Sequence, residues 1–228
     1  MSLDLLEVTA EALGPLVSEV AFLGGASIQL WLTDTAAPQA RETMDADIVV
    51  GVTGYREYAA LGDRLRARGF EEDTTSGVIC RWTLGGRLIL DVMPTDEKIL
   101  GFSNRWYRRA LATAIERRLP SGAVIRAVAP AYLVATKIEA FRDRGRGDYL
   151  ASADFEDVVR LVDGREELMD EVDALPADVR AFVSASFAEM RGDPLFEYGV
   201  AGALLPDAAS QARLPLVMER IARLIGAP

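Results

Sequence analysis

The chain of 228 residues contains no histidine and only one cysteine, Cys80. Without histidine it cannot build a Ser–His or Cys–His nucleophile pair, and zinc sites that use histidine are excluded. A single cysteine excludes an internal disulfide and a multi-cysteine metal site, so nothing argues for an oxidising compartment. Any chemistry must therefore rest on carboxylates, Lys, Arg, hydroxyls and metals that prefer oxygen ligands.

The sequence also lacks long hydrophobic runs and a recognisable targeting segment. No run approaches the ~20 apolar residues that span a membrane. Residues 1–13 carry three acidic residues and no basic one, which is wrong for a secretory or mitochondrial leader. We therefore expect a cytoplasmic protein with no membrane partner.

Positive charge is scarce, except in one segment. The formal net charge of −10 argues against wholesale binding to nucleic acid or anionic membrane. Residues 101–148, however, hold ten basic residues against four acidic ones. This segment would suit an anionic ligand, with Trp106 and Tyr107 as stacking faces, or it is an arginine-rich amphipathic helix lying over its own core. The basic residues are Arg105, Arg108, Arg109, Arg117, Arg118, Arg126, Lys137, Arg142, Arg144 and Arg146.

Hydrophobic periodicity predicts a mixed α/β part followed by a helical part. We place the boundary near residue 129, which gives an α/β domain over 1–129 and a helical domain over 130–228. The first part reads as helices alternating with strands and includes a hairpin that turns at Gly85-Gly86. The expected strands are 20–23, 46–50, 78–84 and 87–93, and the expected helices are 1–16, 27–32, 55–68, 131–144, 152–162, 165–172, 176–190 and 209–225.

A glycine-rich turn lies between the first expected strand and the next helix. It reads Gly24-Gly25-Ala26-Ser27. Glycines allow a ligand to approach the backbone closely, the helix start offers free N–H groups, and the Ser27 hydroxyl adds a donor. Taken alone, the segment is more simply an ordinary glycine-rich turn with Ser27 as an N-terminal helix residue.

Carboxylates occur in two of the expected strands. Asp45 and Asp47 enter the apolar run 48–50, and Asp91 follows the apolar run 88–90. Residues i and i+2 of a strand point to the same side, so the pair could bind hard cations through oxygen, and Asp91 could complete the cluster. Each could instead be a solvated residue at a strand end. Together with the glycine turn, the three match the two-metal arrangement for nucleotidyl transfer, which needs no histidine.

Gly24-Gly25-Ala26-Ser27, followed by Arg41, Thr43, Asp45 and Asp47 in an Arg-x-Thr-x-Asp-x-Asp pattern, resembles the DNA polymerase β-like nucleotidyltransferase superfamily. Within it the chain is similar to the AbiEii-type toxin branch. The resemblance covers residues 20–162. It implies an α/β nucleotidyltransferase domain with a mixed sheet and a helical C-terminal domain. It also implies that Gly24, Gly25 and Ser27 hold the triphosphate, and that Asp45, Asp47 and Asp91 bind Mg²⁺ or Mn²⁺.

The helical part extends the resemblance. Lys137 interrupts the apolar face of an expected helix, and Asp154 and Asp157 follow in an Asp-x-x-Asp pattern. The family carries a Lys and an Asp-x-x-Asp at these places, although the basic residue usual before the first Asp is Ala153 here. A lysine on an apolar stripe needs an anion or must snorkel to solvent. The resemblance makes Lys137 catalytic and nucleotide-binding, and Asp154 nucleotide-binding.

The resemblance implies transfer of a nucleoside monophosphate from an NTP to an acceptor. It points to tRNA or another RNA as acceptor, and to a toxin that has a cognate antitoxin protein as partner. Residues 105–118 and 142–146 are the candidates for holding the acceptor. The alternatives are an enzyme of the same fold that modifies a small molecule such as an aminoglycoside, one that modifies a protein, and a catalytically silent binding module.

Overall fold

The computed structural model describes residues 2–145 and 147–226 and divides the chain into two compact units. Unit 1 contains the described residues up to Leu30 together with Arg41–Ala129. Unit 2 contains Trp31–Ala40 and the described residues from Pro130 onward. The chain is thus a mixed α/β protein in which the loop 31–40, expected within the first domain, belongs to the helical unit.

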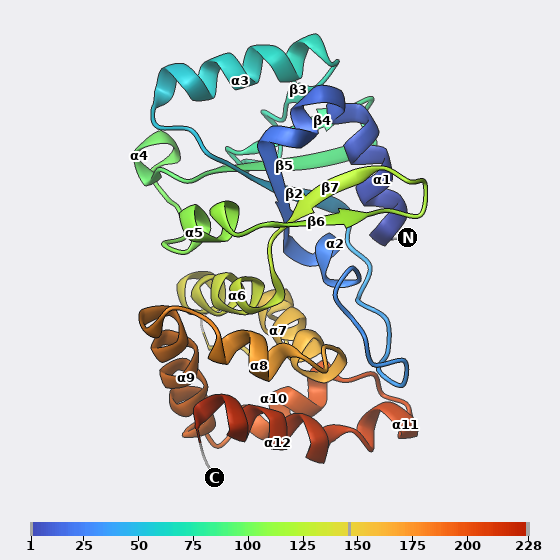
Figure 1. The fold of residues 1–228 in the computed structure, drawn as a ribbon, viewed down its shortest axis with the longest axis vertical. Helices are drawn as coiled ribbons and strands as arrows, with labels where there is room; N and C mark the ends of the chain where they lie inside the picture. Colours follow the sequence, from blue (N-terminus) through green and yellow to red (C-terminus); the bar gives the residue numbers. More distant parts are fainter. Residues whose placement is uncertain (1, 146, 227–228) are drawn as a thin grey trace. The chain divides into compact units, whose positions relative to one another are not determined.

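Unit 1 is built on a mixed sheet of seven strands among the described residues, in the order β3-β4-β5-β2-β1-β7-β6 (Figure 1). Strands β2 and β5 run parallel, as do β1 and β7, and the other neighbours are antiparallel. The strands are β1 (Val20–Leu23), β2 (Asp45–Val50), β3 (Glu71–Glu72), β4 (Arg81–Leu84), β5 (Leu88–Pro94), β6 (Ile115–Arg118) and β7 (Val124–Ala127).

The central strands are the most apolar, because both of their faces are covered. Phe22 of β1, Ile48 of β2 and Leu90 of β5 have no exposed surface. The helical segments of this unit are α1 (Ser2–Leu13), the 3₁₀ helix η1 (Gly14–Glu19), α2 (Gly24–Ile28), α3 (Tyr55–Ala67), α4 (Glu97–Leu100) and α5 (Tyr107–Ala112). The edge strand β6 is mostly exposed, which explains why it lacks an apolar pattern and was not expected.

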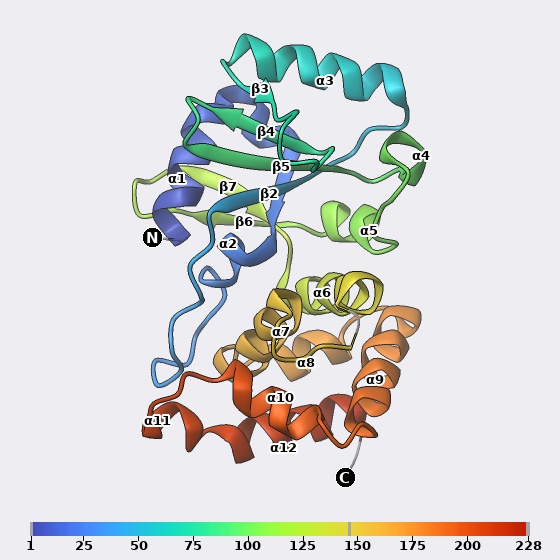
Figure 2. The same ribbon diagram turned by 180° about the vertical axis from the view of Figure 1, so that it is seen from behind.

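The two faces of the sheet are covered by different helices (Figures 1 and 2). Helix α3 covers one face: its Gly62 lies against the Trp82 ring, and the Tyr58 hydroxyl donates to the Val92 carbonyl over 3.1 Å. Because successive strand residues point to opposite faces, Arg81, next to Trp82, points away from α3. Helix α2 contacts β2 and follows β1 directly, at the place where Asp47 lies.

Unit 2 is helical in all its described residues that have regular structure. An aromatic cluster of Phe141, Tyr149, Phe155 and Phe196 forms part of its core, with ring centroids 4.9 to 5.9 Å apart. Its helices are α6 (Pro130–Arg144), α7 (Ala153–Gly164), α8 (Leu168–Asp173), α9 (Ala177–Arg191), α10 (Phe196–Ala203), α11 (Ala208–Gln211) and α12 (Leu214–Ile225).

The single helix expected over 209–225 is wrong. The structure has two helices there, α11 and α12, and the break falls before Pro215 in the first turn of α12. Proline lacks an N–H and is tolerated in the first turn of a helix but not in its interior. Helix α10 was not expected at all.

The loop 31–40 is held to unit 2 by hydrogen bonds and an ion pair. The Gly164 carbonyl at the end of α7 accepts from the backbone N–H groups of Thr33 and Asp34, at 2.8 and 3.0 Å. The Arg213 guanidinium bridges Asp34 and Asp163, at 2.5 and 2.7 Å. In the described residues of both units, no helix is long and apolar enough to cross a membrane.

Candidate functional site

The three predicted aspartates lie on one face of two neighbouring strands. Asp45 and Asp47 alternate along β2 with Ala46 and Ile48, which are fully buried on the other face. In the parallel pairing of β2 with β5, Asp47 lies directly opposite Asp91. The expectation that Asp91 lies on a strand next to the pair is confirmed. The structure therefore brings three carboxylates together, and we call Asp45, Asp47 and Asp91 the carboxylate cluster.

The guanidinium of Arg81, which was not predicted as a site residue, lies in this cluster. Arg81 of β4 is paired with Asp91 across the β4–β5 hairpin. Its Nε and Nη2 donate to Oδ1 and Oδ2 of Asp91, both over 2.8 Å, and Nη2 also donates to Oδ2 of Asp45 over 3.0 Å. Only 19% of the Arg81 side chain and 9% of the Asp91 side chain are exposed. Hydrogen bonding to Asp91 and the charges of Asp91 and Asp45 raise the pKa of Arg81.

These contacts use the oxygens that a metal would need. Both Asp91 oxygens and one Asp45 oxygen accept from Arg81, and the other Asp45 oxygen accepts from the Thr43 hydroxyl over 2.7 Å. Within residues 2–145 and 147–226, no group of three or more Asp, Glu or Cys side chains is arranged to hold a metal ion. As arranged here, the carboxylate cluster does not fit the expected divalent cation, because a guanidinium occupies its oxygens.

The glycine turn lies against the cluster. Gly24 has φ +74°, and a Cβ built on it would fall 1.8 Å from Oδ2 of Asp47. Helix α2 begins at Gly24, three residues earlier than expected, so Gly24 and Gly25 form its first turn. The Ser27 hydroxyl is fully buried and donates to the Gly24 carbonyl over 2.9 Å. The structure thus places Gly24 next to Asp47, while the Ser27 hydroxyl is engaged in a hydrogen bond within its own helix.

Negative potential around the cluster extends to Cys80. Burial, together with the charges of Asp91 and Asp47, raises the pKa of the Cys80 thiol to about 12. Burial likewise raises the pKa of Tyr58, with Cys80 and Asp91 contributing. A buried thiol that is held protonated in this way is a poor nucleophile.

The lysine expected to contact nucleotide is paired inside unit 2. Its Nζ lies 3.0 Å from Oδ1 of Asp154 and 2.7 Å from Oδ2 of Asp157, and all three side chains are buried. Arg144, which is 65% exposed, completes this group at 2.8 Å from Asp154. Burial would raise the pKa of Asp154, but Lys137 and Arg144 outweigh it and the pKa is lowered. The anions that meet Lys137 here are therefore carboxylates of its own unit.

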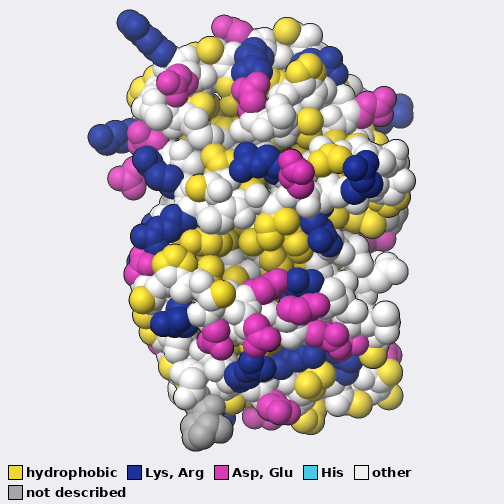
Figure 3. All heavy atoms as spheres, viewed as in Figure 1, with side chains coloured by type: hydrophobic (Ala, Val, Ile, Leu, Met, Phe, Trp, Pro, Cys, Tyr) yellow, Lys and Arg dark blue, Asp and Glu magenta, His cyan; other side chains and the backbone are white. Residues whose placement is uncertain are grey.

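The basic segment 101–148 is not one amphipathic helix. It forms α5, the β6–β7 hairpin and α6. Most of its basic side chains have partners within the protein. Arg117 and Arg126 donate to backbone carbonyls of Leu30 and Leu111, both over 2.8 Å. On the face shown in Figure 3, basic and acidic side chains are interspersed. Arg105, Arg108 and Arg109 are exposed at α5, and Arg146 lies outside the described residues.

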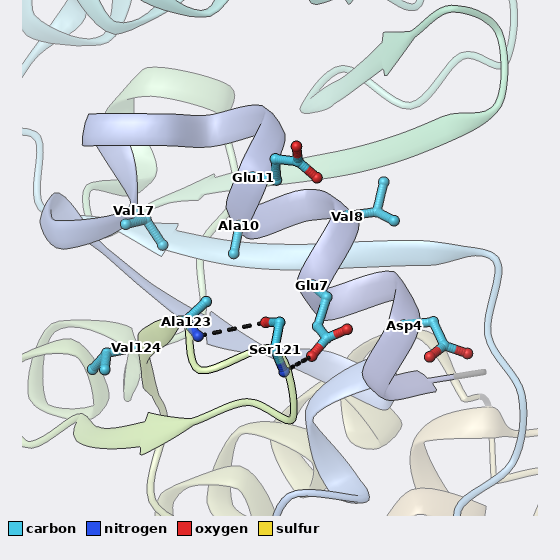
Figure 4. A pocket seen from close by; sticks show the side chains of 9 residues that line it. All are labelled: Asp4, Glu7, Val8, Ala10, Glu11, Val17, Ser121, Ala123 and Val124. Atoms are coloured by element: carbon cyan, nitrogen blue, oxygen red, sulfur yellow. Dashed lines mark hydrogen bonds between the residues drawn. The ribbon is translucent and has the colours of Figure 1, made fainter.

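A separate hollow of about 620 Å³ lies between α1, η1 and the β6–β7 turn (Figure 4). Asp4, Glu7 and Glu11 of α1 line one side of it, and Glu7 accepts a hydrogen bond from the Ser121 N–H over 2.6 Å. No predicted site residue lines this hollow. It has an acidic rim but no group that points to a particular ligand.

The contact of Arg81 with the carboxylate cluster was not predicted from the sequence, because it depends on the register of a hairpin. Leu84 pairs with Leu88, so the turn has three residues, Gly85 to Arg87. A two-residue turn at Gly85-Gly86 would put Arg81 opposite Leu90 and shift one strand's side chains to the other face. A three-residue turn puts Arg81 opposite Asp91. The detectable signal was thus a basic residue and an acidic residue equidistant from the turn.

Comparisons with known proteins add little to this geometry. No protein-family model matches the chain, and no curated protein matches it. Among solved structures, the crystal structure of JHP933 from Helicobacter pylori aligns with 99% of this chain and 93% of that chain, with a TM-score of 0.42 and 11% sequence identity.

Proposed function

We propose that this protein is a nucleotidyltransferase that moves a nucleoside monophosphate from an NTP to an acceptor. The observation that supports the proposal is the meeting of Asp45, Asp47 and Asp91 beside the Gly24 turn. The resemblance to nucleotidyltransferases rests on the segment 24–27 followed by Asp45 and Asp47 in the sequence, and Gly24 lies against Asp47 in the fold. The acceptor with the best support is an RNA, because Arg105, Arg108 and Arg109 lie exposed at α5.

The reaction is a displacement at phosphorus. The acceptor hydroxyl oxygen forms a bond to the α-phosphorus of the NTP, the bond between that phosphorus and the bridging oxygen breaks, and pyrophosphate leaves. The carboxylate cluster would take up the proton of the hydroxyl, and the segment 24–27 would face the triphosphate. Mg²⁺ or Mn²⁺ remains a prediction, since Arg81 uses the oxygens that such a cation would need.

Lys137 and Asp154 are proposed to act from unit 2. A nucleotide phosphate that approached Lys137 would compete with Asp154 and Asp157 for its ammonium group. The setting implied by the resemblance is that of a toxin restrained by a cognate antitoxin. Growth arrest on expression of the wild type, relieved by Asp45→Ala, would support that setting.

The direct test is transfer of label. We expect wild-type protein, incubated with each α-labelled NTP, Mg²⁺ and total RNA, to label RNA with at least one NTP. Asp45→Ala should lower the labelling rate by at least about a hundredfold, the loss typical when a residue at the reacting centre is removed. Asp63→Ala, which removes a carboxylate that is 80% exposed on α3, is the matched control and should retain activity.

A second candidate function is a binding module of the same architecture without catalysis. Arg81 favours it, because an internal guanidinium pairs with Asp45 and Asp91 without any ligand. The two functions separate in a binding experiment. If no NTP is transferred to RNA, protein or a small molecule, and Mg²⁺-NTP binding is unchanged in Asp45→Ala and Asp47→Ala, the enzyme is excluded and the module stands.

A further inference from the structure

The carboxylate cluster needs a positive charge wherever it is buried. Three carboxylates on two neighbouring strands repel one another, and their repulsion grows as water is excluded. Asp91 is almost fully buried, and Asp45 is about one-third exposed. A cation placed among them offsets this repulsion. In this structure Arg81 supplies that cation.

Arg81 is built into the fold and does not reach the cluster by chance. It is a strand residue of β4, directly opposite Asp91, with its side chain 19% exposed. Its fork contacts both oxygens of Asp91, the bidentate geometry in which an arginine–carboxylate pair is strongest. A divalent cation would require the same oxygens, so the guanidinium and the metal cannot both occupy them.

We infer, on the basis of the proposed function, that Arg81 is the internal cation of this site and competes with divalent metal for the carboxylate cluster. While Arg81 is in place, free Mg²⁺ or Mn²⁺ is excluded, and the cluster is stable without metal. A metal gains the cluster only when Arg81 leaves it for another anion. A triphosphate fits that role chemically, because a guanidinium binds phosphate and carboxylate with the same fork.

The test measures metal binding without any nucleotide. Mn²⁺ is titrated into the full chain, and free Mn²⁺ is followed by electron paramagnetic resonance. Arg81→Met removes the charge and keeps much of the volume, and we expect it to bind Mn²⁺ tighter than wild type by roughly tenfold or more. Arg165→Met, which removes an arginine that is 15% exposed and paired with Glu171, is the matched control and should bind like wild type.

One result would overturn the inference: Arg81→Met that binds Mn²⁺ no tighter than wild type. A thermal melt keeps the test decisive if Arg81→Met is poorly folded: Mn²⁺ should raise its Tm and leave that of wild type unchanged. If Arg81→Met is unfolded with and without Mn²⁺, Arg81→Lys is the variant to titrate. The single ammonium of a lysine cannot reproduce the two-pronged contact of the guanidinium, so Arg81→Lys should bind Mn²⁺ tighter than wild type.

Failure here is distinguishable from failure of the proposed function. The Mn²⁺ titration contains no NTP, and the labelling assay uses wild-type protein. Labelling of RNA by wild type, with no gain of Mn²⁺ affinity in Arg81→Met and Arg81→Lys, would leave an enzyme in which Arg81 is structural. A gain of Mn²⁺ affinity without transfer of any NTP would leave the competition intact and remove the enzyme.

Discussion

The contact between Gly24 and Asp47 can be tested by the substitution Gly24→Ala, which adds a single methyl group. Gly24 has φ +74°, a left-handed conformation that L-residues with a Cβ rarely adopt. A Cβ there would lie 1.8 Å from Oδ2 and 2.6 Å from Cγ of Asp47, far inside van der Waals contact. Gly24→Ala should therefore impose backbone strain and also push Asp47 out of the carboxylate cluster.

The two costs can be added. The left-handed backbone costs roughly 1–2 kcal/mol for a residue with a Cβ. Forcing an extra methyl into a packed site costs typically about 1–3 kcal/mol. We therefore expect Gly24→Ala to lower the free energy of unfolding by about 2–5 kcal/mol. Urea denaturation followed by circular dichroism measures this change, and the RNA-labelling assay should show lost transfer at urea-free conditions where the variant is folded.

A control at Gly77 separates the cost of backbone strain from the cost of the steric clash with Asp47. Gly77 has φ +75°, nearly that of Gly24, but a Cβ there would meet nothing within 4 Å. Gly77→Ala should therefore show the strain alone, about 1–2 kcal/mol. Equal losses of stability in the two variants would refute the reasoning, because they would mean that the Asp47 carboxylate does not lie against Gly24.

Two further predictions follow from buried charge and from a buried thiol. Lys137→Met leaves Asp154 and Asp157 buried without their ammonium group, so it should lower the free energy of unfolding by about 3–5 kcal/mol. Arg144 also pairs with Asp154 but is 65% exposed, so Arg144→Met should lower the free energy of unfolding by less than about 1 kcal/mol. Urea melts of both variants check this, and equal losses would contradict it. The Cys80 thiol has an ordinary pKa of 9.0 when unfolded and about 12 when folded, so the unfolded chain loses the proton first and stability should fall as pH rises from about 9 to 12. The free energy of unfolding, measured by urea melts between pH 8 and 11, should fall more steeply for wild type than for Cys80→Ala, by up to about 1.4 kcal/mol per pH unit. Identical slopes would contradict the shift.

Elements that bury a strong apolar pattern were predictable from the sequence. The strand at Val20–Leu23 is confirmed to the residue, and those at 46–50 and 87–93 are confirmed within one residue at each end. Strand β6 was missed because an edge strand needs no apolar alternation, and α4 and α5 were missed because each is too short to show a helical period.

The candidate site was predictable in its acidic half. Asp45 and Asp47 share a face because strand side chains alternate, and Asp91 joins them because β5 pairs with β2. The position of Arg81 was not predictable, since it depends on whether a hairpin turn has two residues or three. The partners of Lys137 depend on how α6 and α7 pack, which local spacing does not determine.

The attachment of the loop 31–40 to unit 2 has a consequence for synthesis and for dissection of the protein. Asp34 forms an ion pair with Arg213, which is synthesised 179 positions later. The loop therefore emerges from the ribosome long before this partner exists. This loop leads directly into the strand that carries Asp45 and Asp47. A nascent chain, or a fragment ended at residue 129, would therefore carry that strand on an unanchored tether. The pairing of Asp34 with Arg213 completes an attachment that the Gly164 carbonyl begins.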